Sequence, residues 1–453
     1  MAPATSSWFG LAVFVVGLAI TAAIYYPGIM TADTWYVYGD IPAESAGDWQ
    51  SPVMTWIWGR LQTFLPGSPP GPMFLLIATI YWAAFGVLTN AVARRSPRMA
   101  ILVPIVALSP PAFLLVGVIW RDVLMAACWL LAAALGLSAA GSRRYRMVFQ
   151  GLGLALIALG LLMRPNALFG APVLAAYVIW PSAFSLKRWA LLYVPGVVVF
   201  YAVIQIAFYG LLHARVQHLT HSILVFDLGG ISAFSGTNQF PGKWSEAEST
   251  FIVDGCYQPA YWDTYWWKDP CSWVMDKLDG DQPDQKKLFG TPELFDAWKK
   301  AVIAHPVAYL QHRLSHFKTF LTYELQQTVE YTTIDQPDKP GPRNAVIQSL
   351  RRLHDAWQRS IVFLPGLWLA LALALLALAW GRRSTPGGTY ALGVGLSAIF
   401  YLGTFLFFGV ASAYRYAYWP VLADLTGFVA VLASYRLRQA VPGVRPTTRL
   451  SQA

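Results

Sequence analysis

Long apolar segments alternate with short polar stretches along most of this chain, and the pattern predicts membrane-spanning helices. A bilayer core is crossed by roughly 20 apolar residues in helical conformation, and about ten segments approach this length. We place them at residues 8–26, 72–93, 99–118, 123–140, 148–163, 167–184, 189–212, 361–380, 388–409 and 417–434. The first segment is not preceded by a basic stretch or followed by a small-residue cleavage site, so we expect a retained helix rather than a signal peptide.

Basic clusters follow every second apolar segment. Because loops rich in Lys and Arg stay on the cytoplasmic side, we expect these loops and both termini in the cytoplasm, with the other loops outside. The clusters are Arg94, Arg95 and Arg98; Arg143, Arg144 and Arg146; Lys187 and Arg188; Arg382 and Arg383; and Arg436 and Arg438. The alternation favours an even number of spans, and we expect the protein in the inner (plasma) membrane of a bacterium.

Composition supports this interpretation. Of the 453 residues, 56% are hydrophobic and only 12% are charged, and the mean hydropathy is +0.46. Such a chain is too apolar for a soluble multidomain protein. The net charge of +10 lies in clusters between apolar segments, so we interpret it as a topology signal and expect no nucleic-acid partner. The predicted fold class is an α-helical polytopic membrane protein.

One outward segment differs in composition from the rest. Residues 213–360 hold most of the Asp, Lys, Gln and His of the chain. They predict an extracytoplasmic domain inserted between the membrane segments of 1–212 and those of 361–453. Cys256 and Cys271 both lie in this domain, and outside the cytoplasm we expect them to form a disulfide.

Two further signals in this segment concern aromatic and basic residues. Aromatic faces stack well on sugar rings, although they also form small cores or contact lipid headgroups. The residues concerned are Trp262, Tyr265, Trp266, Trp267 and Trp273. Residues 309–320 predict an amphipathic helix lying along the membrane, with Arg313, His316 and Lys318 on the face toward water.

Charged residues on the outward turns are the candidates for chemistry. Asp33 follows the first span in the loop 27–71, and a carboxylate there indicates a water-lined site because dehydrating it is costly. Arg121, Arg164 and Arg415 lie outside against the positive-inside pattern. Each alone fits an interface anchor, but together in a bundle they predict an anion site. Asp122 either caps the following helix or takes part in the chemistry.

An anionic ligand at the outer face, surrounded by aromatic residues, is most simply a lipid-linked phosphate. The motifs and their order resemble the C-type (GT-C) superfamily of polytopic membrane glycosyltransferases. Asp33-Thr34 matches the acidic residue that this family carries after its first helix, and Gln50-Ser51-Pro52 stands where many members have His-Pro-Pro or Lys-Pro-Pro. Asp122 resembles the acidic residue of the second outward loop, and Tyr414-Arg415-Tyr416 resembles a late Arg-Tyr motif.

The resemblance implies a GT-C-like bundle that transfers a monosaccharide from a polyprenyl-phosphate donor to a cell-envelope glycan, lipid or protein on the outer face of the membrane. Asp33 is the expected general base and Asp122 a second catalytic residue. The donor phosphate is expected to bind Arg121, Arg164, Arg415, Tyr414 and Tyr416. The expected substrate-binding residues are Gln50, Trp35, His221 and Asp227.

The chain departs from the family pattern in two respects. Thr34 stands where the family has a second acidic residue, which leaves open whether Asp33 and Asp122 bind a divalent metal such as Mg²⁺ or Mn²⁺. The large domain is inserted before the last three spans instead of being appended at the end, which indicates a subfamily with its own acceptor.

Two other functions stay open. An O-antigen ligase or polymerase acting on diphosphate-linked glycans would depend on Arg215, His218 and His221 more than on Asp33. The two histidines share a helical face but lack a third metal ligand at telling spacing. A non-enzymatic flippase or transporter for the lipid carrier would need ionisable residues near the bilayer midplane, which appear scarce in the sequence.

Overall fold

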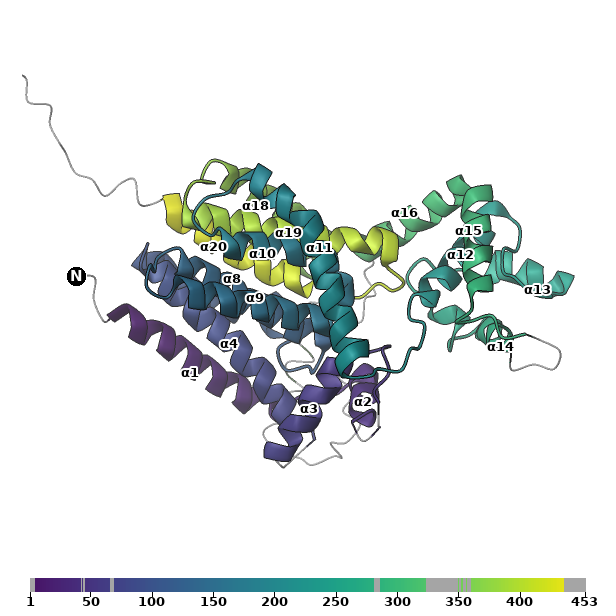
Figure 1. Ribbon diagram of the computed structural model, residues 1–453, viewed down its shortest axis with the longest axis horizontal. Helices are drawn as coiled ribbons and strands as arrows, with labels where there is room; N and C mark the ends of the chain where they lie inside the picture. The colour runs from purple at the N-terminus through teal and green to yellow at the C-terminus, as the bar shows by residue number, and fades with distance from the viewer. Residues whose placement is uncertain are drawn as a thin grey trace, which may run out of the picture.

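The protein folds into a bundle of long apolar helices with a smaller helical domain at one end (Figure 1). The computed structural model describes residues 5–41, 43, 45–65, 69–280, 286–322, 349, 352, 356 and 360–435. The basic cluster at Arg436 and Arg438 lies outside the described residues. Within them, regular structure is helical apart from isolated β-bridges, as the sequence predicts.

Seven of the described helices are long and apolar enough to cross a membrane. They are α1 (Thr5–Tyr25), α4 (Gly71–Ala93), α8 (Arg121–Ala139), α9 (Arg146–Met163), α11 (Leu186–Gln205) with its π-helical extension Ile206–Leu211, α19 (Pro386–Phe408) and α20 (Tyr418–Tyr435) with the preceding 3₁₀ turn Tyr414–Ala417. α1 begins and α20 ends at the bundle end opposite the domain (Figure 1). This arrangement agrees with two termini on the same side of a membrane.

Helix α8 forms the centre of the bundle, since nearly all of its residues are buried. It packs against α4, α9 and α20. Small residues permit this close packing of helices. At Gly160 of α9, for example, a Cβ atom would lie 2.5 Å from the indole of Trp129 in α8. This packing fixes the position of the N-terminal end of α8, where Arg121 and Asp122 lie, within the bundle.

Three of the ten expected spans are shorter or broken. The segment 99–118 does not form one continuous helix, so that expectation is wrong. It is divided into α5 (Pro97–Ala100), α6 (Leu102–Ala107) and α7 (Pro110–Phe113), because Pro110 and Pro111 cannot continue a helix from the preceding turn. The segment 167–184 folds as the 3₁₀ turn Pro165–Phe169 and the short α10 (Ala171–Ile179). The last of the three is α18 (Pro365–Trp380). The count of ten therefore stays a prediction.

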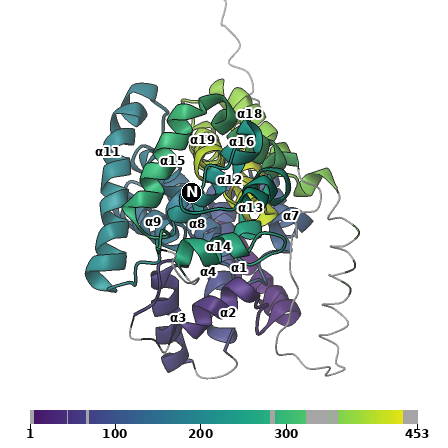
Figure 2. The ribbon, with the colours of Figure 1, turned by 90° about the vertical axis from the view of Figure 1, so that its right-hand side faces the viewer.

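The inserted segment has a core of its own. It contains α12 (His221–Ser235), α13 (Glu246–Phe251), α14 (Trp273–Asp279), α15 (Pro292–Ala304) and α16 (Pro306–Thr322). Figure 2 views the molecule from this domain, with α2 (Ala32–Gly39) and α3 (Pro52–Phe64) below it. The predicted disulfide is present between Cys256 and Cys271, both of which are buried.

The expected face of α16 toward water is wrong for two of its three polar residues. Arg313 and His316 are buried, with exposed fractions of 2% and 0%. Arg313 donates through Nη1 to the carbonyl of Gly409 at 2.8 Å. Nδ1 of His316 lies 2.8 Å from the carbonyl of Pro259, and burial lowers the pKa of His316 to about 3. These residues join the domain to the end of α19 instead of facing solvent.

Candidate functional site

Asp33 and Arg415 form an ion pair at the end of the bundle next to the domain. The carboxylate of Asp33 lies 2.6 Å from Nη2 of Arg415, with side-chain exposed fractions of 43% and 19%. Nε2 of Gln50 donates to the other oxygen of Asp33 at 3.5 Å. The positive charge of Arg415 lowers the pKa of Asp33 by more than burial raises it, with a further contribution from Arg121. Asp33 is therefore ionised at neutral pH.

The position of Asp33 follows from contacts between the loop 27–71 and the residues at the N-terminal end of α8. The backbone of Ile29 exchanges hydrogen bonds with Gly117 and Ile119 at 2.8 and 3.0 Å. The hydroxyl of Thr34 donates to the carbonyl of Ile119 at 3.0 Å. Together these bonds hold α2 beside α8. Because Asp33 lies in the first turn of α2, it also lies at the positive end of that short helix.

Arg164 and Asp122 form a second, closed pair. Nε and Nη1 of Arg164 lie 2.9 and 3.3 Å from the two carboxylate oxygens of Asp122, which is the bidentate geometry that favours arginine. Both residues are buried, and the guanidinium of Arg164 lies 4.3 Å from the centre of the Tyr416 ring. This pair neutralises its own charge inside the bundle.

Arg415 is held between aromatic rings. Its guanidinium lies 4.7 Å from the ring centre of Trp120 and 5.3 Å from that of Tyr416. The aromatic faces stabilise its charge. The Nε atom of Arg415 is buried and has no hydrogen-bond partner among the described residues. Arg415 thus has a donor to spare beyond its contact with Asp33.

Arg121 differs from the other two arginines because its charge is not paired. Its Nη1 donates to the carbonyl of Trp49 at 3.2 Å, and no carboxylate among the described residues forms an ion pair with it. The three arginines outnumber by one the two carboxylates, Asp33 and Asp122, that pair with them. An excess positive charge beside a carboxylate fits an anionic ligand that also reacts there.

A small cavity lies between Asp33 and the N-terminal end of α8 with Arg121 and Asp122. It is lined by Asp33, Gln50, Trp120, Arg121 and Asp122, together with Thr34, Val37, Met54 and Ile119. Its volume of about 10 Å³ is room for roughly one water molecule. In this conformation the site holds its charged groups together but is closed to anything as large as a sugar.

Three residues expected in the site have other contacts. Tyr414 is fully buried, and its hydroxyl donates to the carbonyl of Pro111 at 3.3 Å, away from the arginines. Asp227 is fully buried in the domain, where it contacts Arg313 at 2.7 Å and His312 at 3.1 Å. Nδ1 of His221 accepts a hydrogen bond from the backbone of Gly290 at 3.0 Å. The polar groups of all three are therefore occupied by partners within the fold.

Trp35 lies in α2 next to the pair and packs edge-to-face on Tyr38, with ring centres 5.7 Å apart. Its indole N–H is buried without a hydrogen-bond partner in the described part of the chain. Tyr416, by contrast, contacts both Arg164 and Arg415 with its ring. Of the expected aromatic residues, Tyr416 therefore lies against the arginines, whereas Trp35 contacts Tyr38 and Tyr414 contacts Pro111.

Two residues of the site were not singled out by the sequence. The ring of Trp120 makes a cation–π contact with the guanidinium of Arg415, and its indole N–H donates to the hydroxyl of Thr31 at 2.9 Å. Asp263, from the distant domain, interacts electrostatically with Asp33 and Arg415. For Trp120 the Trp-Arg-Asp sequence was a signal, whereas no local pattern links residue 263 to residue 33.

The residues present do not form a metal site. Among the described residues no group of three or more His, Cys, Asp or Glu side chains is arranged to hold a metal ion. Asp33 and Asp122 each contact an arginine, and these positive charges disfavour a divalent cation.

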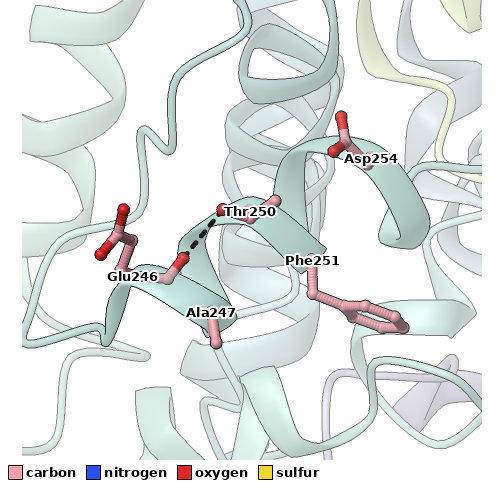
Figure 3. A pocket seen from close by; sticks show the side chains of 5 residues that line it. All are labelled: Glu246, Ala247, Thr250, Phe251 and Asp254. Carbon is pink, nitrogen blue, oxygen red and sulfur yellow. Dashed lines mark hydrogen bonds between the residues drawn. The ribbon is translucent and has the colours of Figure 1, made fainter.

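Another hollow lies on the domain, lined by Glu246, Ala247, Thr250, Phe251 and Asp254 (Figure 3). All five belong to α13 and the following π-helical turn Ile252–Cys256. The hydroxyl of Thr250 donates to the carbonyl of Glu246 at 2.9 Å (Figure 3). With two acidic side chains and no arginine or lysine in its lining, this hollow does not suit a phosphate.

No protein-family model and no curated protein matches the sequence. Among solved structures, the chain is similar to the Archaeoglobus fulgidus oligosaccharyltransferase in complex with Zn and sulfate, at 12% identity over 93% of this chain and 49% of that one, with a TM-score of 0.38. It is also similar to ArnT from Cupriavidus metallidurans in the apo state, at 14% identity over 90% and 78% of the two chains, with a TM-score of 0.33.

A further match is the archaeal oligosaccharyltransferase AglB from Archaeoglobus fulgidus with an inhibitory peptide and a dolichol-phosphate, at 12% identity over 98% of this chain and a TM-score of 0.36. The chain spans about half the length of these archaeal enzymes. Likeness at such TM-scores is distant, so the function of this chain has to be argued from its own site.

Proposed function

We propose that this protein is a GT-C-type glycosyltransferase that moves a monosaccharide from a polyprenyl-phosphate donor to a hydroxyl group of a cell-envelope acceptor. The observation that carries the proposal is the meeting of Asp33 and Arg121 on one cavity at the bundle end next to the domain. Asp33 supplies an ionised base, and Arg121 supplies a positive charge that no carboxylate of the described chain neutralises. A lipid-linked phosphate ester needs both.

The reaction requires a proton acceptor and a stabilised leaving group. Asp33 takes the proton of the acceptor hydroxyl while the oxygen of that hydroxyl bonds to the anomeric carbon of the sugar. The bond from this carbon to the phosphate oxygen breaks, and the phosphate leaves with the electron pair. Arg121 stabilises the negative charge that collects on it, as a preorganised cation does in a site with little water.

Arg415 links donor binding to the base. While it is paired with Asp33 it lowers the pKa of the carboxyl group, and a carboxylate of low pKa is a weak base. Its buried Nε atom has no hydrogen-bond partner among the described residues, so it can donate to a phosphate oxygen once the site opens. A bound phosphate would share the positive charge of Arg415, and the basicity of Asp33 would rise at the moment when the donor is in place.

Substrate entry requires movement, since the cavity has room for roughly one water molecule. Asp33 and Gln50 come from the loop 27–71, and Arg121 and Asp122 come from α8, so a separation of these two segments would open the cavity. In this scheme Arg164 and Asp122 stay fixed as a buried pair and hold the floor of the cavity in place. We place this site at the outer face of a bacterial inner membrane, in keeping with the distribution of basic loops.

The test is binding and transfer by the purified full-length chain in nanodiscs. Undecaprenyl phosphate is the probe for the phosphate site, and Arg121→Gln is the decisive variant. Loss of one charge-assisted contact, of about 1.5–3 kcal/mol, should weaken binding roughly 10- to 100-fold. Arg215→Gln is the matched control, because Arg215 pairs with Asp40 at 3.4 Å and is 55% exposed. Equal binding by wild type and Arg121→Gln would refute the proposal.

The ligase or polymerase alternative predicts a different pattern. It requires His221. The centre of the His221 ring instead lies 5.4 Å from that of His218 and 5.5 Å from that of Phe289, within the domain. Comparing Asp33→Ala with His221→Ala for glycan products on a gel separates the two functions. Loss of product in His221→Ala alone would favour the ligase.

The transporter alternative has one residue in its favour that the sequence analysis did not count. Asp424 lies inside α20, is fully buried and has no hydrogen-bond partner for either carboxylate oxygen among the described residues. A single such residue does not make a path across the bilayer, since transport sites use several polar groups near the midplane. Movement of labelled undecaprenyl phosphate across proteoliposomes without sugar transfer would support transport.

A further inference from the structure

The disulfide-closed loop of the domain, residues 256–271, reaches back to the candidate site. Its backbone bonds to the segment that follows α19: Trp262 donates to the carbonyl of Val410, and Ser412 donates to the carbonyl of Ala260, both at 2.8 Å. An isolated β-bridge joins Tyr261 to Ala411. This segment leads directly to the turn that carries Arg415.

The same loop also contacts the first outward loop. The ring of Trp49 lies 5.8 Å from that of Trp262 and 4.9 Å from that of Trp266. The carbonyl of Trp49 accepts the hydrogen bond of Arg121. The disulfide-closed loop is thus fixed on two sides of the cavity, next to the segments that supply Arg121 and Arg415.

The aromatic residues of this loop differ in burial. Trp262 is only 4% exposed and stacks on Trp266 with an angle of 20° between the rings. Trp266 itself remains 40% exposed. A buried ring therefore supports an exposed one, which gives a rigid apolar surface that is open to a ligand. The apolar C–H face of a sugar ring fits such a surface, as flat apolar groups do on aromatic side chains.

Asp263 supplies a polar group beside this surface. Its carboxylate is 24% exposed, and in the described part of the chain its ion-pair partner is Lys268 at the long distance of 3.9 Å. Burial raises the pKa of Asp263, while the positive charge of Lys268 lowers it. The neighbouring Trp266 contacts Trp49, and the next residue in the chain, Gln50, donates to Asp33. A carboxylate next to an aromatic ring can accept hydrogen bonds from sugar hydroxyls while the ring stacks on the C–H face.

We propose that Trp266 and Asp263 form the subsite that binds a saccharide acceptor and presents its hydroxyl group to Asp33. This inference rests on the proposed glycosyl transfer and adds the acceptor class, a glycan with an exposed sugar ring. We assign the acceptor and not the donor sugar because the surface belongs to the domain, outside the bundle (Figure 1). A lipid-linked donor reaches Arg121 from the membrane, whereas a water-borne glycan reaches the site past the domain.

The test is saturation-transfer difference NMR on the full chain in nanodiscs with a panel of methyl glycosides of glucose, galactose, mannose, arabinose and N-acetylglucosamine. At least one glycoside should bind, and Trp266→Ala should weaken it about tenfold. Asp263→Asn should weaken it as well, and Trp266→Phe should restore part of the binding. Trp267→Ala is the matched control, because Trp267 is 59% exposed and its ring lies against the ammonium group of Lys268. Thermal unfolding of each variant separates loss of the subsite from loss of fold.

Several results would overturn the inference. These are failure of the wild type to bind any glycoside, equal binding by Trp266→Ala, or displacement of the glycoside by undecaprenyl-phosphate glucose, which would make the subsite that of the donor sugar. Quenching of tryptophan fluorescence by brominated lipid that is larger in the wild type than in Trp266→Phe, with no glycoside bound, would mean that the ring contacts the membrane. Binding of undecaprenyl phosphate is measured in parallel. If undecaprenyl phosphate binds in an Arg121-dependent way but no glycoside binds, only the acceptor subsite is refuted. If a glycoside binds but undecaprenyl phosphate does not bind in an Arg121-dependent way, the proposed function is refuted.

Discussion

The carboxylate of Asp33 lies 2.6 Å from Nη2 of Arg415, although one residue follows the first membrane helix and the other precedes the last. This contact joins α2 to the 3₁₀ turn Tyr414–Ala417. It also places the proposed base in contact with a cation that has a free donor for phosphate. Asp33 is therefore both held in position and restrained as a base until an anion competes for Arg415.

The substitution Asp33→Asn should abolish sugar transfer with the fold intact. Loss of a general base typically lowers the rate by roughly 10²- to 10⁴-fold. The side chain of Asp33 is 43% exposed, so the loss of its charge should change thermal unfolding only slightly. Asp40→Asn is the matched control, since Asp40 caps the end of the same helix and pairs with Arg215. Transfer is measured in nanodiscs, and activity retained in Asp33→Asn would remove it as base.

The pH profile of transfer should depend on Arg415. The positive charge of Arg415 lowers the pKa of Asp33, so the acid limb of kcat/KM should lie below the unperturbed value of about 3.9. In Arg415→Gln the acid limb of the remaining kcat/KM should move to higher pH. In Arg415→Lys, which keeps the positive charge, the acid limb should move less. The ion pair should also stabilise the fold above pH of about 3.9 and lose its effect as pH falls through the lowered pKa. An unmoved limb in Arg415→Gln would contradict the pairing.

Asp122 and Arg164 should behave as a structural pair. Replacing Asp122 by Asn leaves the buried guanidinium of Arg164 without its partner, which typically costs about 3–5 kcal/mol. The double variant Asp122→Asn, Arg164→Gln should lose less than the sum of the two single variants, because the unpaired charge is gone. Thermal unfolding in detergent measures both. If Asp122→Asn loses activity at unchanged stability, Asp122 acts in the chemistry instead.

Sequence patterns predicted the features that depend on local composition and failed where tertiary packing decides. Apolar segments predict membrane helices, and the two cysteines of the inserted segment predict a disulfide. Both expectations are confirmed. In the sequence prediction Asp33 and Arg415 both lie on outward turns, which a helical bundle can bring together. Their meeting is observed, while their roles remain proposals.

The failures share one physical cause. Arg313 and His316 have the spacing of a helix face exposed to water. Both are nevertheless buried, because Asp227 and backbone carbonyls of other segments supply ion-pair and hydrogen-bond partners. Tyr414 and Tyr416 are neighbours of Arg415 in sequence, but only the ring of Tyr416 lies against the arginines. Which polar side chain finds which partner depends on packing between distant segments, and periodicity carries no information about it.

Asp227 should be essential for the domain and not for the reaction itself. It accepts from the indole of Trp298 at 2.7 Å and lies 2.7 Å from Nη2 of Arg313, with no exposed surface. In Asp227→Ala the buried Arg313 loses its partner, and the domain should lose about 3–5 kcal/mol. Limited proteolysis should then cleave the domain while binding of undecaprenyl phosphate persists. A domain of normal protease resistance in Asp227→Ala would show that this network is dispensable.

The disulfide should control the acceptor side of the site and leave the donor side intact. Cys256 and Cys271 close a loop with a sequence separation of 15, and such a loop contributes about 3 kcal/mol by restricting the unfolded chain. Without the bond, Trp262 and Trp266 should lose their fixed position against Trp49. The variant Cys256→Ser, Cys271→Ser should therefore weaken glycoside binding, whereas Arg121-dependent binding of undecaprenyl phosphate should remain. Cys128→Ala is the control, because this thiol is buried in α8 outside the loop. Equal loss of both ligands in the double variant would mean that the loop supports the whole site, including Arg121, through the carbonyl of Trp49.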